Sequence, residues 1–330
     1  MRQLQLKAHG EPSDVVELRT VDEPTLDHDE VLLSMEAAPL NPSDFMLVRG
    51  TYRVRPTFPF PLGSEGVGRV VQTGPNVDVT LRGKRVLIVP NNEQGTWADL
   101  VVVPARNVVP LSNEADPIQL SMIGINAVTA YLLLSKYVRL MPGDWIGQTA
   151  GNSAMGEYIA KLAKLAGVQT LNIVRRKEAA EQVRRRGDEH VIVSGDDLHR
   201  NIEKVLGEKK LSLVLDSLGG TPVGELAGWL KPGGSMVSYG VQDGQFPAFS
   251  PYQFIFRSLS LHGFSLSNLM RNAPQVEIRE VYQKLGDLVA DGSLGAAVEF
   301  VCPLEEFEEA FARSLGSNRR GKVVFKLNHQ

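Results

Sequence analysis

The sequence predicts an α/β protein that combines a β-rich region with a doubly wound parallel sheet. Short apolar runs separated by Gly, Pro and Asn fill the first part of the chain, among them "EVLLSME" and "ADLVVVP", and this pattern is typical of strands and turns. Between residues 144 and 240, apolar runs alternate with helical patterns, which predicts parallel strands joined by right-handed crossover helices. A length of 330 residues gives room for two domains.

Each element follows from the local hydrophobic periodicity. Apolar residues at helical spacing predict a helix from 117 to 138, which closes at Pro142-Gly143. In the alternating region we expect strands at 144–150, 169–176, 189–193, 211–220 and 235–240, and helices at 155–167, 177–187, 198–207 and 224–234. The last part of the chain predicts a helix at 275–292, a strand at 296–301, another helix, and a closing strand at 321–327.

Composition narrows the class of protein. The formal net charge of −3 and the pI near 6.1 give no overall attraction to nucleic acid or to an anionic membrane surface. The chain has no apolar run of about eighteen residues, so we expect no membrane insertion. The single cysteine, Cys302, excludes an intrachain disulfide and a cysteine-rich zinc lobe. The beginning of the chain lacks the layout of a signal peptide, and we expect a cytoplasmic protein.

A turn rich in small residues joins the first strand of the alternating region to its helix. It reads "GNSAMG", residues 151–156, which is one residue away from a dinucleotide fingerprint because Ser153 stands where the second glycine belongs. Backbone N–H groups and the helix dipole bind a pyrophosphate at such a turn. A turn chosen only for helix–strand packing is the alternative. A P-loop is excluded because Glu157 and Tyr158 follow Gly156.

Three basic residues end the second strand of this region. Arg175, Arg176 and Lys177 occur where NAD-binding proteins carry an acid for the ribose 2′-hydroxyl. A guanidinium group matches a phosphate in two parallel hydrogen bonds, whereas an acid would repel it. An exposed basic helix start is the other interpretation, but cations at that end oppose the helix dipole. The sequence therefore favours NADPH over NADH.

Several motifs in order along the chain carry a family resemblance. They are "PLNPSDFMLVRGTY", "LGSEGVGRVV", "GTWADLVVV", "IGINAVTAY", "GNSAMG", "IVRRK", "MVSYG", "LHGFSLSN" and "RRGKVVFKL". Together they resemble the zinc-independent medium-chain dehydrogenase/reductase superfamily, and within it the mitochondrial-type 2-enoyl thioester reductases, with quinone oxidoreductases as near relatives. The resemblance implies a GroES-like catalytic domain from residues 1–120 and 268–330, and a Rossmann NADPH-binding domain from residues 121–267.

The resemblance also implies site residues. Tyr52, at the end of "RGTY", stands at the position of the family's proton donor. The alternative for Tyr52 is a purely structural role, as an aromatic side chain that covers the core. The implied NADPH contacts are Asn126, Asn152, Ser153, Ala154, Met155, Arg175, Arg176, Lys177, Tyr239, Gly240, Val241, Gln242, Phe264, Ser265, Leu266 and Lys322.

Two of these positions depart from the family pattern, and the Ser64-Glu65 segment bears on metal binding. Ala154 stands where many relatives have glycine, and Ser265 stands where the enoyl reductases often have a large aromatic residue. Zinc-dependent relatives carry a His-Glu pair where this chain reads Ser64-Glu65, and residues 1–100 hold no cysteine. We therefore expect no metal.

The function that these observations predict is NADPH-dependent reduction of the conjugated double bond of a 2-enoyl thioester of coenzyme A or acyl carrier protein. Reduction of a quinone or another activated alkene on the same zinc-free fold is the first alternative, and an NADPH-binding sensor or structural protein without turnover is the second. Arg49, Arg53 and Arg55 beside Tyr52 could attract a coenzyme A phosphate or be solvated surface. The resemblance implies a homodimer, for which the edge strand "LSLHGF" is a candidate interface.

Overall fold

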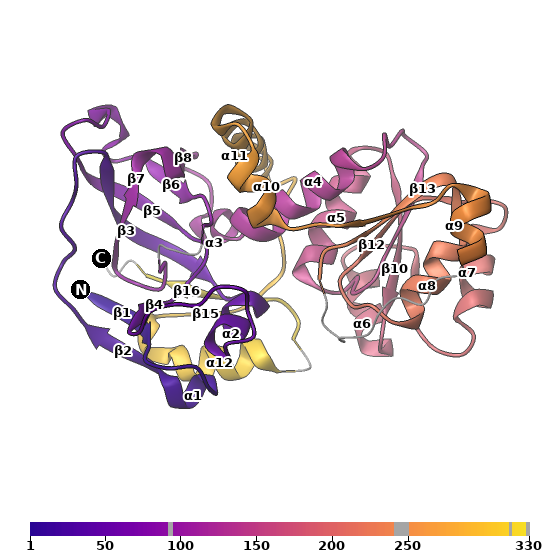
Figure 1. Ribbon diagram of the computed structural model, residues 1–330, viewed down its shortest axis with the longest axis horizontal. Helices are drawn as coiled ribbons and strands as arrows, with labels where there is room; N and C mark the ends of the chain where they lie inside the picture. The colour runs from indigo at the N-terminus through magenta and orange to yellow at the C-terminus, as the bar shows by residue number, and fades with distance from the viewer. Residues whose placement is uncertain (92–94, 241–250, 317–318, 328–330) are drawn as a thin grey trace. The chain divides into compact units, whose positions relative to one another are not determined.

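The computed structural model describes residues 1–91, 95–240, 251–316 and 319–327. It divides into two compact units (Figure 1). Unit 1 comprises residues 1–128 and 269–330, and unit 2 comprises residues 129–268. The predicted fold class is confirmed: unit 1 is β-rich, and unit 2 is built on a parallel sheet with helices on its faces.

Unit 1 contains two sheets among the residues that the structure describes. The smaller has the order β2-β1-β4, and the larger has the order β15-β16-β3-β5-β6-β8 with β7 paired to β3. Its strands are β1 (Arg2–Leu6), β2 (Val16–Thr20), β3 (Glu30–Pro39), β4 (Phe60–Pro61), β5 (Val67–Thr73), β6 (Arg85–Ile88), β7 (Leu100–Pro104), β8 (Val108–Pro110), β15 (Val298–Cys302) and β16 (Lys322–Lys326). Its helices are α1 (Pro12–Val15), α2 (Pro42–Val48), α3 (Pro117–Ser121), α11 (Gln275–Ala290) and α12 (Phe307–Leu315). Short helical turns are η1 (Val79–Leu81), η2 (Ala105–Asn107), η3 (Ile123–Ala127) and η4 (Leu304–Glu306).

The core of unit 1 joins the two ends of the chain. Trp97 is fully buried, and its ring packs against Phe311 of α12 and Phe325 of β16. The indole N–H donates to the carbonyl of Pro39 at 3.2 Å, which satisfies the polar atom of this buried ring. These contacts hold the C-terminal strand β16 beside β3, so residues from opposite ends of the sequence reach one site.

Unit 2 is a six-stranded parallel sheet with the order β11-β10-β9-β12-β13-β14. In chain order this is 3-2-1-4-5-6, the order of dinucleotide-binding doubly wound folds. Its strands are β9 (Trp145–Gln148), β10 (Gln169–Val174), β11 (Val191–Val193), β12 (Leu211–Asp216), β13 (Leu230–Ser238) and β14 (Ser260–Gly263). Its helices are α5 (Ala154–Leu165), α6 (Lys177–Arg185), α7 (Leu198–Leu206), α8 (Thr221–Gly228) and α9 (Pro251–Arg257), while α4 (Val128–Lys136) and α10 (Leu266–Asn272) cross the unit boundaries along the chain.

Parallel strands place all their carboxyl ends at one edge of the sheet, and the strand order reverses between β9 and β12. Ligands of open α/β sheets bind at such a reversal. The turn after β9 and the basic residues after β10 share this edge because β9 and β10 are paired neighbours, with Gln148 opposite Asn172. The segments after β13 and β14 share it as well.

The structure differs from the sequence prediction in two elements. The helix predicted over 117–138 is broken into α3, the π-helical turn η3 and α4, because side chains from elsewhere in unit 1 bind the backbone of η3. The strand predicted to begin at residue 235 begins at Leu230, where it pairs with Leu211 across a register shift. No helix in the described ranges is both long enough and apolar enough to span a bilayer.

Candidate functional site

The turn between β9 and α5 needs glycine at two positions. A Cβ on Gly151 would lie 2.7 Å from Cβ of Asn172, and a Cβ on Gly156 would lie 2.7 Å from the carbonyl oxygen of Gly151. Both glycines therefore let the helix approach the turn and the neighbouring strand closely, as the first and third glycines of the fingerprint do. The carbonyl of Gly151 also accepts from Arg186 at 2.6 Å, which fixes the turn from outside.

Backbone donors are exposed to a ligand at this turn. Ser153 caps α5, and its hydroxyl accepts from the N–H of Gly156 at 3.0 Å. In the described part of the chain, the N–H groups of Asn152, Ala154 and Met155 donate to no protein acceptor. Three unused N–H groups at the N-terminus of a twelve-residue helix are what an anion requires, so this turn fits a phosphate. Ala154 contributes through its backbone, for which a glycine is not needed.

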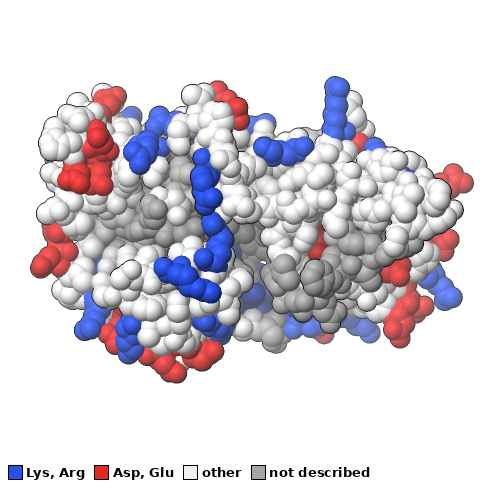
Figure 2. All heavy atoms as spheres, viewed as in Figure 1, with Lys and Arg blue, Asp and Glu red and all other residues white. Residues whose placement is uncertain are grey.

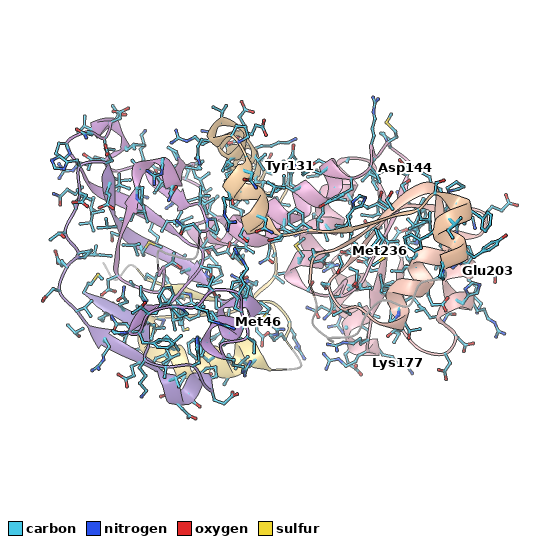
Figure 3. The ribbon with its side chains drawn as sticks, in the orientation of Figure 1. Met46, Tyr131, Asp144, Lys177, Glu203 and Met236 are labelled. Atoms are coloured by element: carbon cyan, nitrogen blue, oxygen red, sulfur yellow. The ribbon has the colours of Figure 1, made fainter. Side chains whose placement is uncertain are left out.

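The three basic residues lie at the same sheet edge. Arg175 and Arg176 follow β10, and Lys177 begins α6 (Figure 3). All three side chains are exposed to solvent. Positive charges at a helix N-terminus interact unfavourably with the helix dipole. A bound anion would reduce this unfavourable interaction.

The remaining predicted residues of unit 2 follow β13 and β14. Tyr239 and Gly240 come directly after β13, and the N–H of Tyr239 donates to the backbone carbonyl of Asp216 at 2.8 Å. Burial raises the pKa of the Tyr239 hydroxyl well above its usual value, so it stays protonated. Phe264 and Leu266 are half-buried, whereas Ser265 is exposed. Val241 and Gln242 lie outside the residues that the structure describes.

Sequence reasoning missed four buried polar residues that shape this edge. Asp216, at the end of β12, accepts from the Thr149 hydroxyl at 2.7 Å and from the N–H groups of Leu218 and Gly219. Gln148 donates to the carbonyl of Gly156 at 2.9 Å and to Asn172 at 2.7 Å. These bonds join β9 to β12 and to α5. A polar residue at the end of an apolar strand was the available signal.

Tyr52 lies in unit 1 on a tightly bonded loop after α2. The carbonyl of Met46, which is labelled in Figure 3, accepts from the N–H groups of Thr51 and Tyr52 at 2.9 and 3.1 Å. Arg55 donates to the carbonyls of Gly50 and Tyr52, both at 2.8 Å. The ring is half-buried and packs on the core of unit 1, and its hydroxyl has no hydrogen-bond partner within the described ranges. The loop therefore holds the ring and leaves the hydroxyl available.

Two of the three arginines beside Tyr52 have partners inside the protein. Arg49 forms an ion pair with Glu11 at 3.1 Å, and Arg55 binds the two loop carbonyls. Both arginines therefore help to fix the loop. All three arginines are exposed, and among the described residues Arg53 makes no hydrogen bond or ion pair. Figure 2 shows acidic and basic side chains interspersed over the visible face of each unit.

A buried polar cluster in unit 1 brings together Asn126 and Lys322. Both bind the side-chain oxygen of Asn41: Nζ of Lys322 lies 2.6 Å from it and Nδ2 of Asn126 lies 3.2 Å from it. Lys322 also donates to the carbonyl of Leu40 at 2.7 Å. On its other side, Asn41 donates through Nδ2 to Glu65 at 2.8 Å. Sequence reasoning missed Asn41 as a member of this cluster.

The π-helical turn η3 carries Asn126 and is pinned by two side chains. The second oxygen of Glu65 accepts from the N–H of Ile125 at 2.7 Å, and the Tyr282 hydroxyl donates to the carbonyl of Gly124 at 2.8 Å. A Cβ on Gly124 would lie 2.9 Å from the Glu65 carboxylate, so glycine lets the turn approach it. Turns of this type frequently interrupt helices at functional sites.

Burial dominates the electrostatics of this cluster. It raises the pKa of Glu65 to about 7 and that of Asp44 to about 6, although the nearby Lys322 ammonium lowers both. Burial also lowers the pKa of Lys322, against the attraction of the two carboxylates. Asp44 accepts from the Ser64 hydroxyl and from the N–H of Asn41 at 2.8 Å. The cluster thus holds two carboxyl groups and one amine at the position of the zinc-family His-Glu motif. In the described residues, no group of three or more His, Cys, Asp or Glu side chains lies close enough to hold a metal ion.

Comparison with known proteins places the chain in a family. Residues 27–113 match the family model of the alcohol dehydrogenase GroES-like domain, and residues 154–290 match that of the zinc-binding dehydrogenases. The mitochondrial enoyl-(acyl-carrier-protein) reductase of Arabidopsis thaliana is 33% identical over 322 residues, which covers 96% of this chain and 85% of that protein. The chain belongs to the medium-chain dehydrogenase/reductase superfamily.

Solved members of the superfamily match nearly the whole chain. A structure described as an NADPH:quinone reductase from Bacillus thuringiensis is 26% identical with a TM-score of 0.89, and the match covers 98% of each chain. The complex of Etr1p with NADP and crotonyl-CoA is 25% identical with a TM-score of 0.85, over 98% of this chain and 99% of that one. The resemblance inferred from the motifs is confirmed.

We predict that Glu65 makes the stability of the protein depend on pH. The carboxyl group keeps its proton up to about pH 7 when folded but loses it near pH 4.5 when unfolded, so stability falls as pH rises through this window. The fall attributable to Glu65 is about 3 kcal/mol at most. Urea unfolding at several pH values measures it, and Glu65→Gln should remove this part of the slope. If the unfolding free energies of wild type and Glu65→Gln changed in parallel with pH, the prediction would be contradicted.

Proposed function

We propose that the protein reduces the conjugated double bond of a 2-enoyl thioester with NADPH. The observation that carries the proposal is the phosphate site in unit 2: three unused N–H groups at the start of α5, with Arg175 and Arg176 at the end of the adjacent strand. The names of the relatives support the choice of substrate, because they are enoyl reductases over nearly the whole chain.

The two ends of the site in unit 2 suit different phosphates. The pyrophosphate would bind the N–H groups of Asn152, Ala154 and Met155, where the helix dipole favours negative charge. The 2′-phosphate would bind the guanidinium groups of Arg175 and Arg176, with Lys177 adding charge. Tyr239, Gly240, Phe264, Ser265 and Leu266 follow β13 and β14 at the same edge and would line the rest of the nucleotide, together with Val241 and Gln242.

We propose Asn126 and Lys322 as contacts of the nicotinamide end of the cofactor. Asn126 lies a few residues before the boundary between the units, on the pinned turn η3. Lys322 is buried and already makes two hydrogen bonds, so one of its three ammonium protons is left for a ligand.

Reduction needs a proton as well as a hydride. Bound NADPH would supply the hydride to the β-carbon of the enoyl thioester, and the electrons of the double bond move toward the thioester oxygen. Tyr52 then donates its phenolic proton to the α-carbon and regains one from water. A phenol is a neutral donor near pH 7, and the loop bonds of Arg55 and Met46 keep the ring in one position. Hydrogen-bond donors at the thioester oxygen lower the barrier to hydride transfer.

Quinone reduction is a second candidate function. The structural match to the Bacillus thuringiensis protein favours it, since that protein is described as an NADPH:quinone reductase. A quinone accepts hydride without a carbon-bound proton, so this reaction would not need Tyr52. An NADPH-binding protein without turnover is the remaining candidate, and the same experiment separates all three.

We further propose that the protein forms a homodimer through the edge of the unit 2 sheet. Strand β14 is the last in its sheet, and Leu261 on it is half exposed. Ile255 and Phe256 of the preceding helix α9 are each 69% exposed. Apolar side chains beside an open strand edge suit pairing with a second copy about a two-fold axis.

A reducing compartment suits the single thiol, and the cytoplasm is the compartment that we propose. Cys302 is buried, and burial with the nearby Glu306 and Glu309 raises the pKa of its thiol to about 12. The relatives carry "mitochondrial" in their names, so the mitochondrion is the other compartment to consider.

We predict that Tyr52→Phe abolishes enoyl reduction selectively. Turnover of crotonyl-CoA, followed by loss of NADPH absorbance, should fall about 10²- to 10⁴-fold because the proton donor is gone. Tyr252→Phe, which makes the same change at an exposed ring, is the control. Benzoquinone turnover that both variants leave intact, with no crotonyl-CoA turnover in wild type, would support the quinone candidate. Tight NADPH binding without turnover of either substrate would support the non-catalytic one.

We predict that Arg175→Ala and Arg176→Ala each weaken NADPH binding about ten- to a hundredfold, because each removes a charge-assisted hydrogen bond to the 2′-phosphate. NADH binding should hardly change. Fluorescence titration measures both affinities, and Arg185→Ala in the last turn of α6 is the matched control. Equal losses for NADPH and NADH would exclude the assigned role.

We predict that sedimentation velocity gives the mass of a dimer of the 36.2 kDa chain. The pair of substitutions Ile255→Lys and Phe256→Lys should yield monomers, because burying two ammonium groups at the interface is unfavourable. Val79→Lys changes an equally exposed apolar residue of unit 1 and should leave the dimer intact. A wild-type monomer, or a dimer that survives the α9 substitutions, would rule out this interface.

A further inference from the structure

Hydrogen-bond chemistry fixes the direction of two side-chain amides in the buried cluster of unit 1. An ammonium group can only donate, so the atom of Asn41 that Lys322 contacts is its oxygen. Above its pKa the Glu65 carboxylate can only accept, so the atom of Asn41 that it contacts is the nitrogen. Asn41 is therefore held from both sides in one orientation.

The orientation of Asn41 sets that of Asn126. The oxygen of Asn41 is an acceptor, so Asn126 must turn its Nδ2 toward it, at 3.2 Å. The Asn126 side-chain oxygen then faces away from Asn41. Asn126 is half-buried, unlike the fully enclosed Glu65, so its side chain is the more accessible of the two to a ligand.

We propose that Glu65 is a positioning residue that acts through Asn41 to make Asn126 present a hydrogen-bond acceptor to the bound ligand. The inference rests on the proposed function for the identity of the ligand. A nicotinamide nucleotide offers suitable donors in its ribose hydroxyls and its carboxamide NH₂ group. Glu65 is suited to the role because both of its oxygens are occupied, by Asn41 and by the N–H of Ile125.

Replacing Glu65 with Gln should reverse this relay. The N–H of Ile125 cannot turn, so the Gln oxygen must face it, and the Gln NH₂ group then faces Asn41. The Gln NH₂ group can donate to Asn41 only if Asn41 rotates against its hydrogen bond from Lys322, and this rotation turns the Asn41 NH₂ group toward Asn126. Asn126 rotates in turn and presents a donor to the ligand in place of an acceptor. In this orientation the Asn41 NH₂ group also faces the Lys322 ammonium, so that two hydrogen-bond donors oppose each other.

Replacing Asn126 with Asp tests the same relay from its other end. In the native background, a carboxylate oxygen would face the Asn41 oxygen, and the two acceptors repel each other. In the Glu65→Gln background, the Asn41 NH₂ group faces position 126 and can donate to the carboxylate. The second carboxylate oxygen is again an acceptor for the ligand. The double variant should therefore recover what each single variant loses.

The first measurement is urea unfolding without cofactor, at a pH about one unit above the Glu65 pKa so that the carboxylate form dominates. Glu65→Gln and Asn126→Asp should each lower the midpoint, and the double variant should lie above the sum of the two effects. Recovery of folding in the double variant, where Glu65→Gln alone does not fold, is the same result. Additive midpoints would overturn the relay whether or not the protein binds NADPH.

The second measurement is NADPH binding by fluorescence titration. Each single variant should bind about tenfold more weakly than wild type, and the double variant at least fivefold more tightly than Glu65→Gln, as a coupled pair requires. Coupled stability without NADPH binding in wild type would leave the relay standing and refute the proposed function. Additive losses of affinity would overturn the role of Asn126 as an oriented acceptor.

The matched control separates orientation from charge. Asp44→Asn removes a carboxylate from the same cluster, but Asp44 contacts Ser64 and the backbone of Asn41 and not its amide. Asp44→Asn combined with Asn126→Asp therefore restores the cluster charge without reversing the relay. It should show no recovery. Recovery equal to that of the Glu65 pair would mean that net charge alone is responsible and would overturn the proposal.

Discussion

The buried carboxyl group of Glu65 makes the interactions on which the structure of unit 1 depends. A charge removed from water is tolerated only when its oxygens are bonded and a counter-charge lies near. Asn41 and Ile125 supply the bonds, and Lys322 supplies the charge. These partners come from the start of α2, the turn η3 and the start of β16. The two hydrogen bonds and the counter-charge of one carboxyl group therefore hold together three segments that are distant in sequence.

In unit 2, backbone geometry and not a buried charge brings the predicted site residues together. Its parallel sheet places a glycine turn, two arginines and the segments after β13 and β14 at one edge, and the turn offers N–H groups instead of charged side chains. Unit 1 supplies the chemical groups: a tyrosine on a fixed loop and amides with a defined orientation. In the proposed function, phosphate recognition belongs to residues of unit 2 and proton donation belongs to Tyr52 of unit 1.

Local patterns predicted most of unit 2, because each strand, turn and helix there is encoded by adjacent residues. The strand, Gly151 turn and helix α5 follow from short-range periodicity and from small residues at fixed spacing. The cluster in unit 1 could not be predicted in this way, since Asn41 and Lys322 are 281 positions apart. From the sequence, Ser64-Glu65 indicates only that the His-Glu pair of the zinc-dependent relatives is missing, and not that Glu65 is part of a buried cluster. The break of the helix at η3 depends on Glu65 and Tyr282, which no property of residues 117–138 reveals.

The central claim is that hydride passes from NADPH to the β-carbon of an enoyl thioester. The most direct test uses NADPH deuterated at C4 of the nicotinamide ring, on the face that the enzyme uses, with crotonyl-CoA as acceptor. The account predicts butyryl-CoA with deuterium at C3 and a proton from water at C2, as read by NMR. Deuterium at C2, or consumption of NADPH with crotonyl-CoA recovered unchanged, would contradict it.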